Sequence, residues 1–478
     1  MNIRLSLIVF LLILADFCAR GQAIRSFTPD TLTFTEELTE FFDRISNKDN
    51  REAALTTLEN FKILWHSDAF DTTQQNAIYG LSNLMLDRRV KSYPYFAVML
   101  QSITSMKNQD YSRQQILTWM DGVVQSLEGS RSKRDFSNFM DFSASFLENQ
   151  SLYESRLFRW YTTGHRNYRF VSDSAFSVVF NPTDLICTNG RDSSIIYNTS
   201  GAYDPLENRW YGNEGKITWE RAGLDPDKVY ARFGSFSISL KSSPYTIENV
   251  NFHNYDYLPE PLPGTLLEKI STDVVGPGEA DYPFFQSDVK DLFIGGIFKD
   301  VDYTGGFAMK GANILGEGTE FRTAKLIFKR PYRDKEGKYN LLVARSRSFI
   351  IRPDGINASK AQVTIHHQDD SIFHSGLQFK YMHDKREVSL FRIEKGISES
   401  PYFNSFHNVD IDSEAVYWKM NEENIRFRSI EGIQPNSEAL FISDKFFIER
   451  EYDMLQGLDY THPLITIYNY GRKYNTNR

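Results

Sequence analysis

The stretch NQSLYES, residues 149–155, separates two parts of the chain that differ in hydrophobic period. Before it, apolar residues recur at helical spacing, as in Leu38, Phe41 and Ile45. After it, apolar and polar residues alternate, as in FSVVF, residues 176–180. A period near 3.6 indicates helix, and a period of two indicates strand. The sequence therefore predicts an α+β protein with its helices and strands in separate domains.

The part before this stretch, residues 24–155, is typical of an all-α domain. Four of its six predicted helices begin at residues that can cap a helix, namely Thr33 (with Glu36 in a capping box), Asn50, Asp71 and Ser112. The other two cover Tyr93–Met106 and the residues after Asp135. Short loops favour antiparallel neighbours, so we expect a helical bundle or a short α-solenoid.

The part after it, residues 156–443, is typical of an all-β region. About 300 residues of strand pattern are too many for one sandwich, so the alternatives are a β-solenoid, a β-taco or tandem β-sandwiches. The region could form one unit or two. A loose recurring pattern favours stacked rungs: FII, residues 349–351, leads through Gly355 to alternating Ala361, Val363 and Ile365. The C-terminal segment, residues 444–478, carries a predicted helix over residues 444–455 and a strand or helix start at residues 465–470.

The first 23 residues have the layout of a secretory signal peptide. Arg4 precedes the apolar run LSLIVFLLILA, residues 5–15, and GQA, residues 21–23, fits a cleavage site. We therefore expect export to the periplasm, an outer-membrane-associated location or secretion. The rest of the sequence has no apolar run near 18 residues, so we expect no transmembrane segment in the mature chain. Cleavage removes Cys18, and Cys187 is then expected to be a buried apolar side chain.

Length and charge restrict the classes of protein further. The 478 residues suit two or three domains. The net charge of −8 argues against broad nucleic-acid binding, which needs a basic surface. No strict internal repeat is visible in the sequence.

Parts of the β-region resemble known envelope proteins. DSIFHSGLQF, residues 370–379, and INASKA, residues 356–361, are similar to rungs of OstA-like and AsmA-like proteins. GKITWER, residues 215–221, resembles uncharacterised exported proteins of the Bacteroidota. The resemblance implies a β-fold with an apolar lining between two membranes, and in some members a lipid cargo. The helical N-terminal part is not expected in the simplest OstA-like proteins.

One aromatic cluster is a candidate ligand site. Tyr203, Trp210, Tyr211 and Trp219 lie around a predicted hairpin. Exposed Trp and Tyr rings can stack on sugars or anchor a protein partner. The alternative, which the sequence favours, is that these rings pair across strands and pack into the core. With Glu214 or Glu220 as an acid, the same cluster would suit a polysaccharide-active enzyme.

Other patterns carry less chemistry. Five histidines lie close together in sequence, namely His366, His367, His374, His383 and His407. His366 and His367 would point to opposite faces of a strand, and no HExxH or paired Cys accompanies them, so we predict no metal site. The carboxylate pairs Asp225/Asp227, Asp300/Asp302 and Asp410/Asp412 are spaced acceptably for glycoside hydrolysis, although turn chemistry explains the first two more simply. We predict no catalytic residue and no cofactor.

These observations favour an exported cell-envelope protein that acts as a non-catalytic scaffold or as a conduit for an apolar ligand such as lipid. The helical domain would bind an envelope partner. A polysaccharide-binding or polysaccharide-active β-protein is the alternative. We also expect residues 24–155 to fold alone, unless the apolar residues just after the junction (Leu157, Phe158, Trp160 and Tyr161) pack back onto the last helix.

Overall fold

A computed structural model describes residues 24–129, 132–164, 166–273, 276, 279–319, 321–332, 336–392, 400–428, 439–443, 452–453 and 463–474. The predicted signal peptide and most of the predicted helix over residues 444–455 lie outside these residues. The chain divides into two units. Unit 1 comprises Met1–Asp288 and Met309–Ala312, and unit 2 comprises Val289–Ala308 and Asn313–Arg478.

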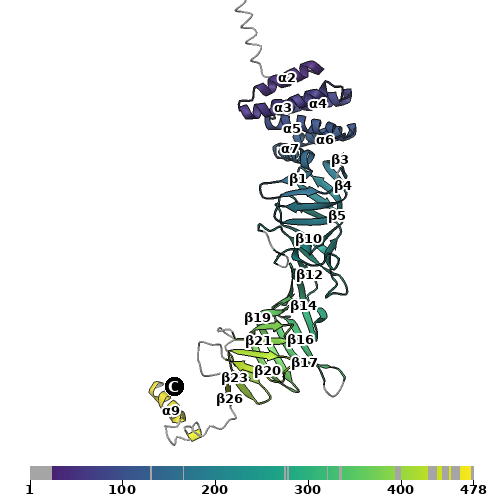
Figure 1. Cartoon of the computed structure of the whole chain (residues 1–478). Helices are drawn as coiled ribbons and strands as arrows, with labels where there is room; N and C mark the ends of the chain where they lie inside the picture. The colour runs from purple at the N-terminus through teal and green to yellow at the C-terminus, as the bar shows by residue number, and fades with distance from the viewer. Residues whose placement is uncertain are drawn as a thin grey trace, which may run out of the picture. The chain divides into compact units, whose positions relative to one another are not determined.

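Unit 1 begins with the predicted all-α region, which the structure confirms (Figure 1). Its α-helices are α2 (Thr31–Asp43), α3 (Lys48–Trp65), α4 (Thr72–Asp87), α5 (Ala97–Asn108), α6 (Arg113–Glu128) and α7 (Ser132–Asn149). A short π-helical turn, η1 (Ser92–Phe96), precedes α5. Helix α3 packs on α5 and α5 on α7, while α4 packs on α6. Two parallel rows of successive helices are the arrangement of a short α-solenoid.

The N-terminal capping residues of four helices can be compared with the predicted ones. Asp71 caps α4 in a capping box with Gln74, and Ser112 caps α6, as predicted. Two predicted caps are wrong, because the capping side chains lie three residues earlier. Asp30 accepts hydrogen bonds from the backbone N–H groups of Leu32 and Thr33, and Asn47 accepts one from Asn50. Thr33 and Asn50 thus donate to the cap, and each helix begins one residue after its capping residue.

The last helices share an aromatic core with the first strands. On α7, the ring of Phe139 lies 4.8 Å from that of Phe176, and the ring of Phe146 lies 4.6 Å from that of Tyr168. On α6, the Gln115 amide accepts a hydrogen bond from the backbone N–H of Phe170 and donates one to its carbonyl oxygen. Of the apolar residues just after the junction, Leu157 is exposed, and Trp160 is buried with its ring 5.6 Å from that of Tyr245 on β10. The helical and β-regions of unit 1 are therefore packed together through β3 and β4.

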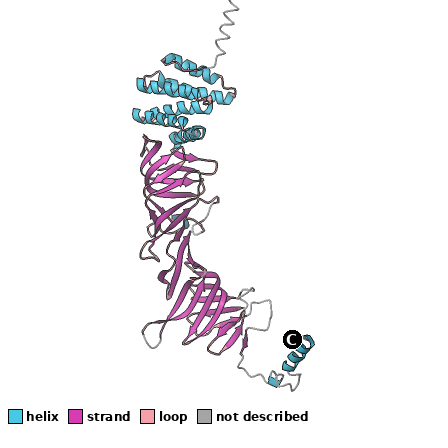
Figure 2. Ribbon diagram, turned by 180° about the vertical axis from the view of Figure 1, so that it is seen from behind, coloured by secondary structure: helices cyan, strands magenta, loops and turns pink. Residues whose placement is uncertain are grey.

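The β-part of unit 1, drawn in magenta below the helices in Figure 2, is built from antiparallel strands. The pairing of these strands gives two sheets that share two long strands. The described strands are β1 (Ser151–Glu154), β2 (Arg159–Thr162), β3 (Tyr168–Ser172), β4 (Phe176–Thr188), β5 (Ser193–Asp204), β6 (Arg209–Gly212), β7 (Gly215–Thr218), β8 (Val229–Phe233), β9 (Phe236–Ser239), β10 (Tyr245–Asn254), β11 (Leu262–Glu268) and β12 (Phe284–Ser287). The second half of β4 pairs with β2, and its first half pairs with β3. The first half of β5 pairs with β7, and the pairing continues in order through β8, β10, β11 and β12. The second half of β5 pairs with β6, which pairs with β9.

A β-bulge lets each long strand serve both sheets. In β4 the inward residues Phe176, Val178 and Phe180 are followed by two exposed residues, Asn181 and Pro182, before the alternation resumes at Thr183. The extra residue shifts the alternation by one position, so the strand bends while the same face stays inward. The register of β5 shifts at the same place, where Asn198 adopts a left-handed conformation with φ of 50°.

Unit 2 repeats this pairing scheme. Its described strands are β13 (Leu292–Phe298), β14 (Val301–Lys310), β15 (Asn313–Glu317), β16 (Ala324–Pro331), β17 (Lys338–Ser346), β18 (Ser348–Arg352), β19 (Gly355–His367), β20 (Asp370–Met382), β21 (Glu387–Phe391), β22 (Tyr402–Asn404), β23 (Val409–Asp412), β24 (Ala415–Lys419), β25 (Arg426–Arg428) and β26 (Leu440–Ile442). The halves of β19 pair with β17 and β18, as those of β4 pair with β2 and β3. The first half of β20 pairs with β22, which pairs with β23, and its second half pairs with β21, which pairs with β24. In unit 1, one half of β5 pairs in the same way with β7 and then β8, and the other half with β6 and then β9.

The core of unit 2 lies between its two sheets. Phe328 on β16 and Tyr381 on β20 come from different sheets, and their ring centroids are 4.8 Å apart. Tyr402 on β22 and Phe427 on β25 make a second contact of this kind at 5.8 Å. In each unit, long bent strands belong to both of two facing sheets, with antiparallel pairing throughout the described residues, and the β-region is divided between the two units.

The C-terminal segment contains a helix in its described part, α9 (Pro463–Tyr474). This confirms helix at residues 465–470, where the sequence left strand or helix open. Among the described helices, none combines the length and the apolar character that crossing a membrane requires.

Candidate functional site

Three of the four aromatic residues of the candidate cluster are fully buried. Tyr203 and Trp210 lie opposite each other on β5 and β6, and Trp219 follows β7. The ring of Trp210 packs against Phe180 at 5.2 Å, and that of Trp219 contacts the ring of Phe252 at 4.9 Å. In these positions the three side chains present no surface on which a sugar ring could stack.

Tyr211 is the member of the cluster that faces solvent. It follows Trp210 on β6, and successive side chains of a strand point to opposite faces, so Tyr211 is 48% exposed. Its ring lies beside a shallow hollow of about 520 Å³ in the outer face of β4, β5 and β6. The hollow is lined by Val179, Phe180, Asn181, Pro182, Ser200, Gly201, Ala202, Tyr211 and Asn213.

The two acids considered with this cluster do not join it. Glu214 and Glu220 are both exposed, and neither lines the hollow beside Tyr211. Glu220 lies in the short helix η2 (Glu220–Ala222), where it accepts a hydrogen bond from the Tyr197 hydroxyl at 3.4 Å. The arrangement therefore lacks a pair of carboxylates flanking an aromatic platform within the described residues, which glycoside hydrolysis by two acids needs.

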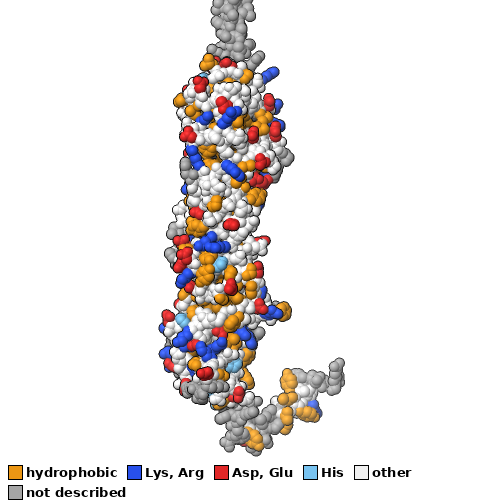
Figure 3. Space-filling model, turned by 90° about the vertical axis from the view of Figure 1, so that its right-hand side faces the viewer, with side chains coloured by type: hydrophobic (Ala, Val, Ile, Leu, Met, Phe, Trp, Pro, Cys, Tyr) orange, Lys and Arg blue, Asp and Glu red, His pale blue; other side chains and the backbone are white. Residues whose placement is uncertain are grey.

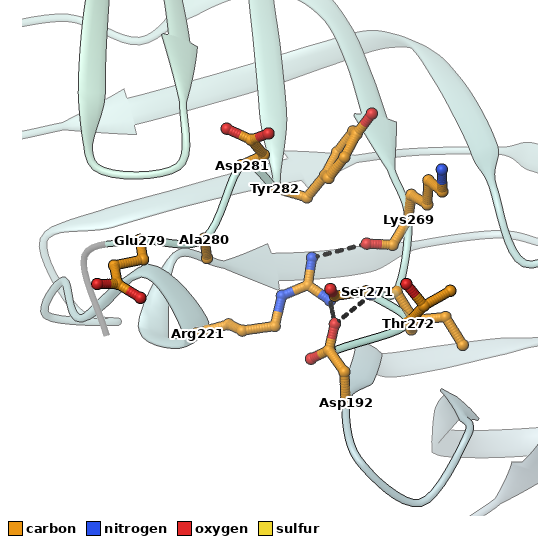
Figure 4. A pocket seen from close by; sticks show the side chains of 10 residues that line it. Asp192, Arg221, Lys269, Ser271, Thr272, Glu279, Ala280, Asp281 and Tyr282 are labelled. Carbon is orange, nitrogen blue, oxygen red and sulfur yellow. Dashed lines mark hydrogen bonds and ion pairs between the residues drawn. The ribbon is translucent and has the colours of Figure 1, made fainter. Parts of the chain in front are cut away.

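A second hollow of unit 1, of about 250 Å³, is built around Arg221 (Figure 4). The Arg221 guanidinium lies 3.0 Å from the Asp192 carboxylate and also binds the Glu268 carboxylate through a short contact. It donates a further hydrogen bond to the Lys269 carbonyl oxygen at 3.0 Å. Asp192 accepts a hydrogen bond from the Ser271 backbone N–H at 2.6 Å. These bonds tie η2, the β4–β5 turn and the end of β11 together.

Glu268 is the buried partner in this network. Its side chain is 2% exposed, and burial raises its pKa to about 7, although Arg221 and the Lys269 backbone N–H favour the carboxylate. Both terminal nitrogens of Arg221 are already bonded within the chain, to Asp192 and to Glu268, which leaves the guanidinium little capacity to bind a ligand. We therefore interpret the Arg221–Glu268 ion pair as a structural contact, called the clasp below. Forty-seven residues separate the pair, so no spacing in the sequence indicated it.

Cys187 lies in the same buried region. Its side chain has no exposure, as expected from the sequence. Burial raises the pKa of its thiol to about 12, and the nearby Glu268 and Asp192 carboxylates act in the same direction. Nucleophilic chemistry needs the thiolate, so this environment suits an inert side chain.

We predict that Cys187 does not react with thiol reagents in the folded protein. At pH 8 a thiol with a pKa of about 12 is ionised to roughly one part in 10⁴, and burial also blocks access. The protein cleaved after Ala23 should therefore show negligible labelling by iodoacetamide in buffer and one label per chain in concentrated urea. Rapid labelling of the folded protein would contradict the described burial.

Three of the five histidines have separate surroundings, and His407 contacts the same Phe406 ring as His367. His374 is buried, its Nε2 donates to the Ser400 carbonyl oxygen at 2.9 Å, and its Nδ1 accepts from the Gly376 backbone N–H at 3.0 Å. Burial lowers the pKa of the ring and Arg392 acts in the same direction, while the hydrogen bond to Ser400 opposes them. His383 stacks on Phe298, and His367 contacts Phe406 edge-on. Among the residues that the structure describes, no group of His, Cys, Asp or Glu is arranged to hold a metal ion.

The carboxylate pairs have structural partners. The Asp225 side chain accepts a hydrogen bond from the Asp227 backbone N–H at 2.9 Å, which is a turn interaction. Asp300 has a positive φ of 63° and pairs with Lys338 and Arg386. Asp302 pairs with Lys329, and Asp412 pairs with Arg392. Each of these contacts fixes a turn or a strand edge.

Comparisons with known proteins give no assignment. No protein-family model, no curated protein and no solved structure matches the chain significantly. The resemblance to envelope proteins of the Bacteroidota therefore stays a prediction from the sequence.

Proposed function

We propose that the protein is an exported scaffold of the cell envelope, in which the β-parts of the two units form a packed framework and the helices bind a protein partner. The observation that carries this proposal is the filled interior of this framework. In unit 2, Phe379 and Leu377 on β20 have no exposure, and Phe328 spans the gap between the sheets to Tyr381. A conduit needs space where these rings lie, so the packing favours the scaffold form over the lipid-carrying form.

The surface supports the same role. Acidic and basic side chains are interspersed on the face that Figure 3 shows, with small apolar areas between them. A mixed surface of this kind suits a protein that stays soluble while several partners contact it. On the helical region, Leu32 and Ile63 are 66% and 69% exposed and offer apolar contacts for such a partner.

Site-specific photo-crosslinking in the source cells tests the scaffold against the conduit. We expect p-azidophenylalanine at Ile63 to give crosslinks to envelope protein, and the same group at buried Phe379 to give crosslinks within the chain alone. Phe321, which is 95% exposed in unit 2, is the matched surface position. Lipid crosslinks at Phe379 would contradict the scaffold and favour the conduit.

Export is tested separately. N-terminal sequencing of protein recovered from the cell envelope should begin at Ile24. Recovery of the full-length chain from the cytoplasm alone would contradict the export part of the proposal.

A further inference from the structure

We propose that the hollow beside Tyr211 binds a neutral sugar unit of a glycan chain, an activity beyond the scaffold role. The hollow lies on the outer face of β4, β5 and β6 and has a volume of about 520 Å³. Pockets that bind small molecules have volumes of about 300–1,000 Å³. It is shallow and open to solvent, so an internal unit of a polymer fits as well as a free sugar.

The strand register makes this hollow. Tyr211 pairs with Ala202, and Ala202 pairs with Val179, so a large ring stands beside two small side chains on one face. Gly201, the neighbour of Ala202 on β5, brings the backbones of β5 and β6 close together, because a Cβ there would lie 2.1 Å from the Tyr211 carbonyl oxygen and no larger residue fits. The β4 bulge at Asn181 and Pro182 forms one end. The shape is therefore built by the backbone and does not depend on one mobile side chain.

The lining chemistry matches a sugar. A pyranose ring presents an apolar face of C–H groups, which stacks on an aromatic ring, and a rim of hydroxyl groups, which needs donors and acceptors. Tyr211 supplies the ring and contacts no other described aromatic side chain. Asn181 donates through its amide to Asn167 at 3.0 Å, which leaves its carbonyl oxygen for a ligand. The Asn213 amide makes no hydrogen bond to the described residues and is exposed.

The charge of the lining narrows the ligand class. The residues that line the hollow carry no Lys, Arg, Asp or Glu side chain. Two arginines on this face lie outside the lining: Arg169 on β3 is paired opposite Val179, and Arg209 on β6 donates a hydrogen bond to the Ser237 hydroxyl at 3.0 Å. A uronic acid or a phosphosugar gains affinity from a cation in its site, while a neutral hexose or N-acetylhexosamine needs only the amides and the ring. The geometry therefore points to a neutral hexose or N-acetylhexosamine unit.

The test uses the whole mature chain, with maltohexaose, cellohexaose and chitohexaose as probes and saturation-transfer NMR with titration as the readout. We expect at least one hexaose to bind and Tyr211→Ala to weaken it 10-fold or more. Tyr211→Phe keeps the ring and should change affinity less than 3-fold. Ala202→Leu keeps the tyrosine but places a larger side chain next to it in the hollow, and it should also abolish binding.

The matched control is Tyr255→Ala, which removes a tyrosine that is 57% exposed elsewhere in unit 1. It should leave affinity unchanged. Absence of binding for all three hexaoses at millimolar concentration, or binding that survives both Tyr211→Ala and Ala202→Leu, would overturn the proposal. A circular dichroism spectrum and melt of each variant separate loss of the site from loss of the fold.

Discussion

Replacing Arg221 with alanine should lower the free energy of unfolding by about 3–5 kcal/mol at pH 8, because Glu268 then remains buried without its partner. The loss should be smaller at pH 5, where Glu268 takes up a proton. The folded-state pKa of Glu268, about 7, lies above its ordinary value of 4.5. Folded protein therefore binds more protons than unfolded protein between these values, and the Glu268 contribution to stability falls as pH rises through 7. Urea denaturation at both pH values measures this.

Two variants isolate the effect. Glu268→Gln retains an amide oxygen for Arg221 and removes the charge, so Arg221→Ala should cost clearly less in that background than in the wild type at pH 8. Arg156→Ala replaces an exposed arginine and should change stability by no more than about 0.5 kcal/mol. Equal losses for Arg221→Ala at both pH values, with or without Glu268→Gln, would contradict the clasp.

Replacing Phe139 with alanine should lower the free energy of unfolding by about 3–5 kcal/mol and loosen the packing of α7 on the β-region. Phe139 has no exposure, and its ring packs edge-on against Phe176 of β4 at 4.8 Å. Phe321→Ala removes the same ring from a position that is 95% exposed and should cost less than about 0.5 kcal/mol. Urea denaturation of the two variants gives the comparison.

The same packing changes what we expect of a helical fragment. A fragment ending at residue 155 keeps Phe139, Phe142 and Phe146 but loses the rings of β3, β4 and β5 that cover them. We expect it to aggregate or to melt without cooperativity, while residues 24–312, which contain the described part of unit 1, melt cooperatively. Circular dichroism of both fragments decides this, and a cooperative melt of residues 24–155 would restore the independent helical domain.

The change of period at residues 149–155 was sufficient to predict the α-then-β order, because burial of one face imposes a period on each kind of element. Helix starts were predicted less well. Thr33 and Asn50 are plausible caps by residue type, but Asp30 and Asn47 hold the caps, and several polar residues near a helix start compete for the same N–H groups.

The candidate site was predicted only in part. The alternation on β6 separates Trp210 from Tyr211, but the sequence does not tell which of the two faces the core. A signal that was present is the pair of polar or rigid residues interrupting the alternation, Asn181 with Pro182 and Ser359 with Lys360, which marks the bends of β4 and β19. The Arg221–Glu268 contact joins distant segments and depends on the tertiary fold.

The shared pairing scheme of β4–β5 and β19–β20 bears on how such a chain changes during evolution. Successive long strands run in opposite directions. The gain or loss of one such strand would therefore reverse the chain direction of every strand that follows, whereas the gain or loss of two would leave those directions unchanged. Lineages of this protein should therefore differ in length by hairpins of two long strands, and duplication of a bent hairpin with its bulges is the smallest heritable step that lengthens a unit.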